Sequence, residues 1–214
     1  MTLAPSETAY FHPARFAREK KLLDAVGLPH TDRKYDGSEL GGAVLLAAIL
    51  GAEEAGALRL EVGKTARIFG LRKVDAVLVH AGPKADAFPA GTLEAAAREA
   101  VAAGPKDAEA VVEAMLREDA PDPYAWATWL VARGLAARGL LEVVETRTLK
   151  VFRAQAYVVP DATRALAAAT SPEPVRALLD RAQAQRPDVW RLLQEGLKRG
   201  ASDRTERDSG DGPD

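Results

Sequence analysis

The longest apolar stretch of the chain, Gly41 to Ala52 (GGAVLLAAILGA), places the strongest constraint on its fold. Its apolar residues recur at intervals of three and four, which predicts a helix that Ser38 caps and that ends at Gly56. A membrane span needs about 20 apolar residues, so this stretch is too short to cross a bilayer. We therefore expect a core helix, and we expect it to be the most buried element.

The composition is that of an ordinary globular protein, with 47% hydrophobic and 28% charged residues. The 29 basic and 31 acidic residues give a net charge of -2, which excludes a global attraction to nucleic acid or anionic lipid. The absence of cysteine excludes disulfides, thiolate metal sites and a cysteine nucleophile. The first residues lack the pattern of a signal peptide, so we expect a cytoplasmic location.

Hydrophobic patterning divides the chain into three parts. Residues 1–36 are polar and predict an N-terminal helix, over Ala14 to Val26, followed by a loop. Residues 37–199 carry the periodic apolar pattern of one folded domain. Residues 200–214 have no apolar periodicity, which predicts a disordered tail.

Within the central part, the period of the pattern changes several times. Alternation from Ala57 to His80 predicts a small antiparallel sheet, and alternation over 140–159 predicts a second hairpin. Helices are expected over 91–103, 107–118, 122–139, from Ala162, over 172–183 and over 187–199. The sequence thus predicts an α+β, predominantly helical single domain with short β-hairpins and a winged-helix-like helix–hairpin–helix segment.

No residue pattern typical of catalysis or metal binding stands out. Gly63-Lys64-Thr65 follows a strand, but a phosphate-binding loop needs a glycine where Leu58 stands. No GxSxG elbow occurs. The histidines have no metal-ligand spacing: they are His12, His30 and His80. We expect no catalytic residues, no metal and no cofactor, and a non-enzymatic protein.

Trp126, Trp129 and Arg133 share one face of the helix over 122–139, because they lie at i, i+3 and i+7. Val131 and Leu135 lie on the opposite side, so the helix is expected to be buried between neighbours. Two interpretations remain open. The tryptophans are core or subunit-contact residues, or they form an aromatic stripe beside a cation, as on proteins that rest on a bilayer surface.

Basic residues exceed acidic ones locally in this helix and the hairpin after it, which suits contact with phosphates. The candidates for contact with anionic lipid or phosphate are Arg133, Arg138, Arg147, Lys150 and Arg153. A second positive stretch comprises Lys64, Arg67, Arg72 and Lys73. Charge runs on strands are more often solvated faces than binding sites, so neither stretch identifies a site by itself.

Two segments together resemble the Golgi phosphoprotein 3 family. They are SELGGAVLLAAILGAEEAGALRLEV at 38–62, and LVARGLAARGLLEV at 130–143 followed by TLKVFRAQAYVVPDATRALAA at 148–168; the likeness covers about residues 38–170. The resemblance implies a mostly helical domain that associates peripherally with membranes through a phosphorylated inositol lipid headgroup. It also implies a homo-oligomer formed through the hairpin over 140–159, where Val151 and Phe152 would contact lipid headgroups or a second subunit.

The resemblance also indicates where a headgroup site would lie. The family's basic headgroup positions fall on Gly41, Ala125 and Thr128, which carry no charge, and its aromatic position falls on Tyr35. Arg133 falls where the family often has a basic residue.

Two other functions remain open. A winged-helix DNA-binding regulator would use the helix from Tyr124 to Gly139 for recognition, although that helix lacks Asn, Gln and Lys to read base edges. An enzyme of unknown class would need groups that meet only in the folded chain. An adaptor would also hold a protein cargo, whose identity the sequence does not indicate.

Overall fold

The computed structural model describes residues 2–22, 24–67, 72–116, 122–148 and 152–207, and it describes the backbone alone at 67, 72, 146–148, 152–155 and 202–207. Within these ranges the chain is mostly helical, with eight α-helices and three small antiparallel sheets. The predicted α+β, predominantly helical fold is confirmed.

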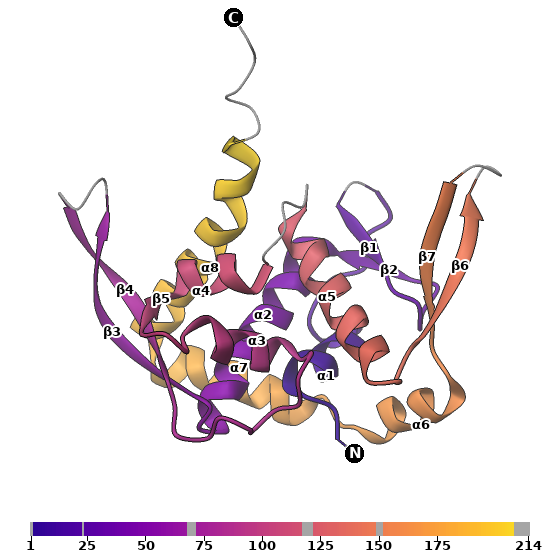
Figure 1. Ribbon diagram of the computed structural model, residues 1–214, viewed down its shortest axis with the longest axis horizontal. Helices are drawn as coiled ribbons and strands as arrows, with labels where there is room; N and C mark the ends of the chain where they lie inside the picture. Colours follow the sequence, from indigo (N-terminus) through magenta and orange to yellow (C-terminus); the bar gives the residue numbers. More distant parts are fainter. Residues whose placement is uncertain (1, 23, 68–71, 117–121, 149–151, 208–214) are drawn as a thin grey trace, which may run out of the picture.

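Helix α2 (Gly37–Glu54) runs through the middle of the molecule, as the apolar stretch predicts (Figure 1). Leu40, Leu45 and Ile49 are completely buried. The prediction that Ser38 caps the helix is wrong, because Asp36 is the cap. Its Oδ1 accepts hydrogen bonds from the backbone N–H groups of Ser38 and Glu39, both at 3.1 Å. Hydrogen bonds from Ser38 and Lys20 hold the pKa of Asp36 below its usual range.

Other helices surround α2. Those that pack directly on it are α1 (Pro5–Phe11), α3 (Leu93–Ala100), α5 (Pro123–Ala137) and α7 (Glu173–Gln185). Helix α4 (Ala108–Leu116) packs on α3 and on α8 (Pro187–Arg207), and α6 (Asp161–Ala169) follows the last hairpin. The predicted start of α5, with Asp122 as the N-cap and Pro123 at the first helical position, is confirmed. Asp122 Oδ1 accepts hydrogen bonds at 3.0 Å from the N–H groups of Tyr124 and Ala125.

The predicted helix over Ala14 to Val26 is wrong. The N-terminal helix is α1, which is followed by a 3-10 turn, η1 (Pro13–Arg15), and later by the paired strands β1 (Ala25–Gly27) and β2 (Lys34–Asp36). Tyr10 and Phe11 of α1 are buried in the core, whereas the predicted stretch offers few large apolar residues. Asp24 has a φ of 60°, a left-handed conformation that an α-helix does not accommodate.

The first predicted sheet is confirmed as a hairpin of two long strands, β3 (Leu58–Arg67) and β4 (Arg72–Ala81), to which β5 (Lys106–Asp107) is added. The second is the hairpin of β6 (Glu142–Thr148) and β7 (Phe152–Val158). Both hairpins rise from the same side of the helical body, one at each end of the molecule (Figure 1). The C-terminal part of α8 also rises from this side, between the two hairpins (Figure 1).

The prediction of disorder from residue 200 onward is wrong as far as Arg207, because α8 continues to that residue. Gly200 lies so close to α4 that an added Cβ would be 2.8 Å from the carbonyl oxygen of Glu109. Arg199 Nε donates to Glu109 Oε2 at 2.9 Å, so α4 holds α8 in place at this level. Residues 208–214 lie outside the described residues.

None of the helices in the described part of the chain has both the length and the apolar character needed to cross a membrane.

Candidate binding surface

The predicted aromatic stripe forms on the surface of α5. The rings of Trp126 and Trp129 stack with centroids 4.1 Å apart and an interplanar angle of 14°. Arg133 Cζ lies 5.0 Å from the ring centroid of Trp129, within the range of a cation–π contact. Trp126 Nε1 donates to the carbonyl oxygen of Leu116 at 3.1 Å, which fixes the first ring against the end of α4.

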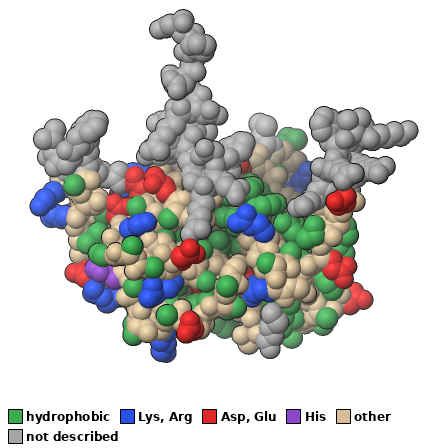
Figure 2. All heavy atoms as spheres, viewed as in Figure 1, with side chains coloured by type: hydrophobic (Ala, Val, Ile, Leu, Met, Phe, Trp, Pro, Cys, Tyr) green, Lys and Arg blue, Asp and Glu red, His purple; other side chains and the backbone are tan. Residues whose placement is uncertain are grey.

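The burial of the two tryptophans is compatible with both interpretations. Trp126 and Trp129 are half-buried and pack against the core, and each keeps some exposure to solvent. Over α5, hydrophobic and basic side chains lie next to one another on the surface (Figure 2). Burial raises the pKa of Tyr157 on β7, and the positive charge of Arg133 opposes this rise. The charge of Arg133 on α5 therefore acts on Tyr157 of β7.

The hairpin β6–β7 exposes apolar side chains near its base. Val143 is 50% exposed and Val158 is 41% exposed. Further along the ladder, Arg147 pairs with Arg153. Arg147, Phe152 and Arg153 are placed by their backbone alone, whereas Lys150 and Val151 lie outside the described residues.

Arg138 does not belong to this surface, although the sequence analysis names it as a contact candidate. Its guanidinium forms an ion pair with Glu7 of α1, and the two side chains are only 11% and 2% exposed. Burial lowers the pKa of Arg138. Glu7 lies far away in the chain and no local pattern signals the pair, so Arg138 fastens α1 to the end of α5 instead of facing a partner.

Three of the four positions that the family resemblance assigns to a headgroup, Gly41, Thr128 and Tyr35, are packed inside the fold, whereas Ala125 is half-buried. An added Cβ at Gly41 would lie 2.4 Å from the carbonyl oxygen of Tyr124, so α2 and α5 touch where the family has a basic residue. Thr128 and Tyr35 are buried, with exposures of 3% each. These three positions leave no room for a headgroup.

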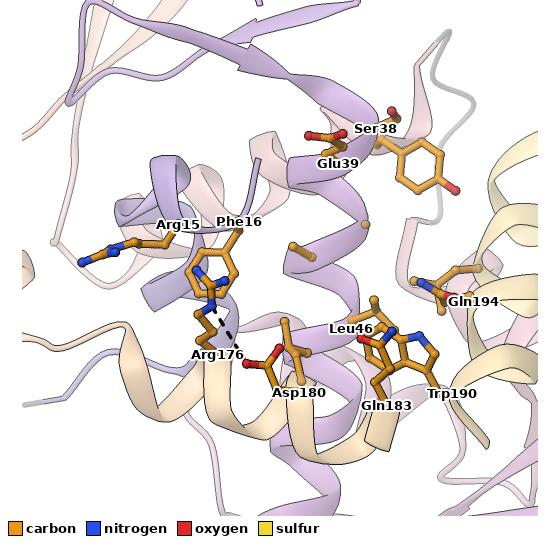
Figure 3. A pocket seen from close by; sticks show the side chains of 15 residues that line it. Arg15, Phe16, Ser38, Glu39, Leu46, Arg176, Asp180, Gln183, Trp190 and Gln194 are labelled. Atoms are coloured by element: carbon orange, nitrogen blue, oxygen red, sulfur yellow. Dashed lines mark ion pairs between the residues drawn. The ribbon is translucent and has the colours of Figure 1, made fainter. Parts of the chain in front are cut away.

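A second feature, which the sequence analysis misses, is a groove of about 430 Å³ along one face of α2. Phe16 after η1, Leu46 of α2 and Trp190 of α8 contribute apolar surface to it (Figure 3). The only local signal is a row on α2 in which Ser38, Gly42 and Leu46 are spaced by four residues.

The charged groups around this groove are balanced and engaged with other residues. Arg176 Nε lies 4.0 Å from Asp180 Oδ2, as the dashed line in Figure 3 marks. Glu39 Oε1 accepts from Arg18 Nε at 2.7 Å. The groove has the size of a small-molecule site, but its lining favours neither anions nor cations.

The described residues do not assemble a metal centre. They contain no group of three or more His, Asp or Glu side chains that could hold a metal ion. His12 Nε2 lies 3.1 Å from the carbonyl oxygen of Ala167, His80 Nε2 lies 3.6 Å from Glu61 Oε2, and His30 packs between Tyr10 and Phe11. His12 is close enough to His30 for its charge to lower the pKa of His30, but no carboxylates join them in a ligand set within the described residues.

A buried carboxyl group lies on α3. Glu94 is completely buried and accepts two hydrogen bonds from Ser6, one from the backbone N–H at 2.7 Å and one from Oγ at 2.9 Å. Burial raises the pKa of Glu94, and the Ser6 bonds oppose this rise. Because neither side chain is exposed, this pair joins α1 to α3 and offers no access to a substrate.

Comparisons with protein families, with curated proteins and with solved structures found no match for this chain. The case for a function therefore depends on the surface and its chemistry.

Proposed function

We propose that this protein is a non-enzymatic peripheral membrane protein that docks on anionic lipid through β6–β7 and the neighbouring face of α5. The hairpin carries the proposal. Its two strands form a sheet of their own, in which Val143 pairs with Tyr157 and Val158 pairs with Glu142. Successive pairs face opposite sides of a hairpin, so each face has one exposed valine.

Such a hairpin is unfavourable in water by itself. An isolated two-stranded hairpin is at best marginally stable, and exposed apolar side chains gain free energy from burial. The headgroup layer of a bilayer would accept these valines. Arg147 and Arg153 pair further along the same hairpin, and each cation near an anionic surface contributes about 1 kcal/mol.

The aromatic stripe supports the same orientation. Tryptophan rings are favoured at the boundary between apolar and aqueous layers, and Arg133 beside them adds a charge for lipid phosphates. The resemblance to the Golgi phosphoprotein 3 family also supports membrane docking, and it adds homo-oligomerisation through the hairpin and an adaptor role for a protein cargo. Because three of the family's four headgroup positions are closed by packing, we propose general anionic lipid as the target instead of one phosphoinositide.

The winged-helix alternative receives less support. Its recognition helix would have to lie in the major groove of DNA. In α5, however, Val131 and Leu135 are buried in the core on one side, and the outward side bears the stacked tryptophans. Tryptophan offers only one donor, so this side does not provide the paired groups that read base edges.

Vesicle flotation tests the proposal with one triple variant. Charge reversal by Arg147→Glu, Lys150→Glu and Arg153→Glu is expected to abolish binding to phosphatidylserine vesicles without changing the melting temperature. The matched control reverses three charges on other parts of the surface, with Lys84→Glu, Arg176→Glu and Arg181→Glu. Equal binding by the hairpin variant and the wild type would contradict the proposal. A wild type that self-associates through the hairpin and ignores vesicles would also contradict it, because the valines would then serve a second copy.

A further inference from the structure

The groove along α2 exposes a helix that is otherwise enclosed. From Leu40 to Ala52, all of which the structure describes, every residue is buried except Gly42 and Ala43, and these two line the groove. The floor runs from Ser38 to Leu46, a length of about 12 Å at the rise of an α-helix. A ligand that lies along this floor would contact the central helix directly.

Gly42 keeps a space that the fold itself does not need. An added Cβ at Gly41 would lie 2.4 Å from the carbonyl oxygen of Tyr124. An added Cβ at Gly51 would lie 2.6 Å from Pro5 Cγ, so packing requires both of these glycines. At Gly42, in contrast, an added Cβ would meet only Tyr124 Cε1, at 3.9 Å. Glycine destabilises the interior of a helix relative to alanine, so at this position it costs stability and leaves the floor of the groove open.

Aromatic side chains from three elements surround this floor. Phe16 follows η1, Tyr124 lies in the first turn of α5, and Trp190 belongs to α8. Figure 3 shows Phe16 to one side of α2 and Trp190 to the other. Aromatic side chains form favourable stacked or edge-to-face contacts with other rings. The walls of the groove therefore favour a planar ring system.

The charged side chains of the lining favour a neutral ligand. Two of them are basic and two are acidic. Each is already in an ion pair: Arg15 with Glu173, Glu39 with Arg18, and Arg176 with Asp180. Because these charges are balanced, a charged ligand would lose its hydration without gaining a partner.

Two glutamine side chains supply hydrogen-bonding groups. Gln183 of α7 and Gln194 of α8 line the groove, and no group in the described part of the chain pairs with either amide. Each amide carries both donors and an acceptor. A ring edge that presents an N–H group beside an acceptor can form two hydrogen bonds with such an amide, as adenine does with glutamine.

We propose that the groove along α2 binds a neutral, planar nitrogen heterocycle, which lies over Gly42 among the aromatic side chains and pairs its polar edge with Gln183 and Gln194. The volume of about 430 Å³ and the mixture of apolar surface with a few polar groups are typical of small-molecule sites. Among the described residues, the lining includes none from β6–β7 or from the aromatic stripe. Binding in the groove and docking on lipid can therefore be tested separately.

Isothermal titration calorimetry with two matched pairs of probes tests the proposal. Riboflavin and adenosine are neutral planar heterocycles, and flavin mononucleotide and adenosine monophosphate each add a phosphate group. At least one neutral probe is expected to bind, and its phosphorylated form is expected to bind no more tightly. The proposal is refuted if neither neutral probe binds. It is also refuted if the phosphate group strengthens binding, because the groove would then select anions.

Gly42→Leu blocks the floor of the groove without removing a contact of the fold. It is expected to weaken probe binding by about tenfold or more, because its side chain would occupy the space of the ring. The melting temperature is expected to stay equal or to rise, since leucine favours a helix more than glycine does. Ala184→Leu is the control, because Ala184 is exposed on α7 and lies outside the groove. Equal probe binding by Gly42→Leu and the wild type would place the probe elsewhere and overturn the proposal.

The two glutamines provide a milder comparison. Gln183→Met and Gln194→Met are each expected to weaken probe binding by about fivefold, the effect of one neutral hydrogen bond. Gln185→Met is the control, since Gln185 lies on the same helix as Gln183 but outside this groove. Should Gly42→Leu lower the melting temperature, the glutamine variants decide the outcome, because they change exposed side chains only. If neither variant weakens binding, the amides do not hold the ring and the proposal fails.

Discussion

Replacement of Glu94 tests how the N-terminal helix is held in the fold. Glu94→Ala removes the acceptor for two hydrogen bonds from Ser6, whose side chain is completely buried. Each buried donor left without an acceptor costs about 1–3 kcal/mol, so we expect a loss of about 4 kcal/mol. In a chain of this size, 1 kcal/mol shifts the melting temperature by about 2–4 °C, which predicts a decrease of about 12 °C.

Glu94→Gln is the matched control. The amide oxygen would accept from the Ser6 N–H, and the amide nitrogen would donate to Ser6 Oγ, since a hydroxyl can act as donor or acceptor. We therefore expect Glu94→Gln to stay within about 1 kcal/mol of the wild type at neutral pH.

The wild type and Glu94→Gln should differ in how their stability depends on pH. Burial raises the pKa of Glu94 in the folded state, so its contribution to stability is fully present below the unfolded pKa. That contribution is lost as the pH rises through the folded pKa. The free energy of unfolding of the wild type, relative to Glu94→Gln, should therefore fall as the pH rises.

Urea denaturation followed by circular dichroism, repeated across a pH series, measures the free energy of unfolding of the wild type, Glu94→Ala and Glu94→Gln. Three results would refute the reasoning: Glu94→Ala as stable as the wild type, Glu94→Gln as damaging as Glu94→Ala, or a wild-type advantage that grows with pH.

Two other predictions concern packing and titration. Gly134→Ala should prevent native packing of α5, because the added Cβ would lie 1.9 Å from the carbonyl oxygen of Gly91, whereas Gly27→Ala meets nothing within 4 Å. Equal melting temperatures of these two variants would contradict the α5 packing. Burial lowers the pKa of His30 to about 4, so its contribution to stability is present above the ordinary pKa of 6.5 and is lost as the pH falls toward 4. Proton NMR of the imidazole checks this, and a titration near 6.5 would disprove it.

Local signals were sufficient to predict much of the fold. The Asp122-Pro123 start of α5 and the shared face of Trp126, Trp129 and Arg133 follow from neighbouring residues alone, and the structure confirms them. Alternating hydrophobicity likewise predicted both hairpins.

Long-range contacts account for the failures. Ser6 and Glu7 belong to a polar stretch that precedes the predicted N-terminal helix, but they are buried because Glu94 and Arg138, from distant helices, supply their partners. Because Arg138 pairs with Glu7 inside the fold, it is not part of the candidate surface. The groove beside α2 could not be predicted either, since several elements that are distant in sequence line it.

Flotation of the unmodified protein tests the central claim most directly. The protein would be mixed with vesicles of phosphatidylcholine alone, with added phosphatidylserine, or with added phosphatidylinositol 4-phosphate, each at low and high salt. The account predicts flotation with both anionic mixtures, none with neutral vesicles, and release at high salt as the charges are screened. Flotation with no mixture, or equally with neutral vesicles, would contradict docking on anionic lipid, and flotation with phosphatidylinositol 4-phosphate alone would contradict a general anionic target.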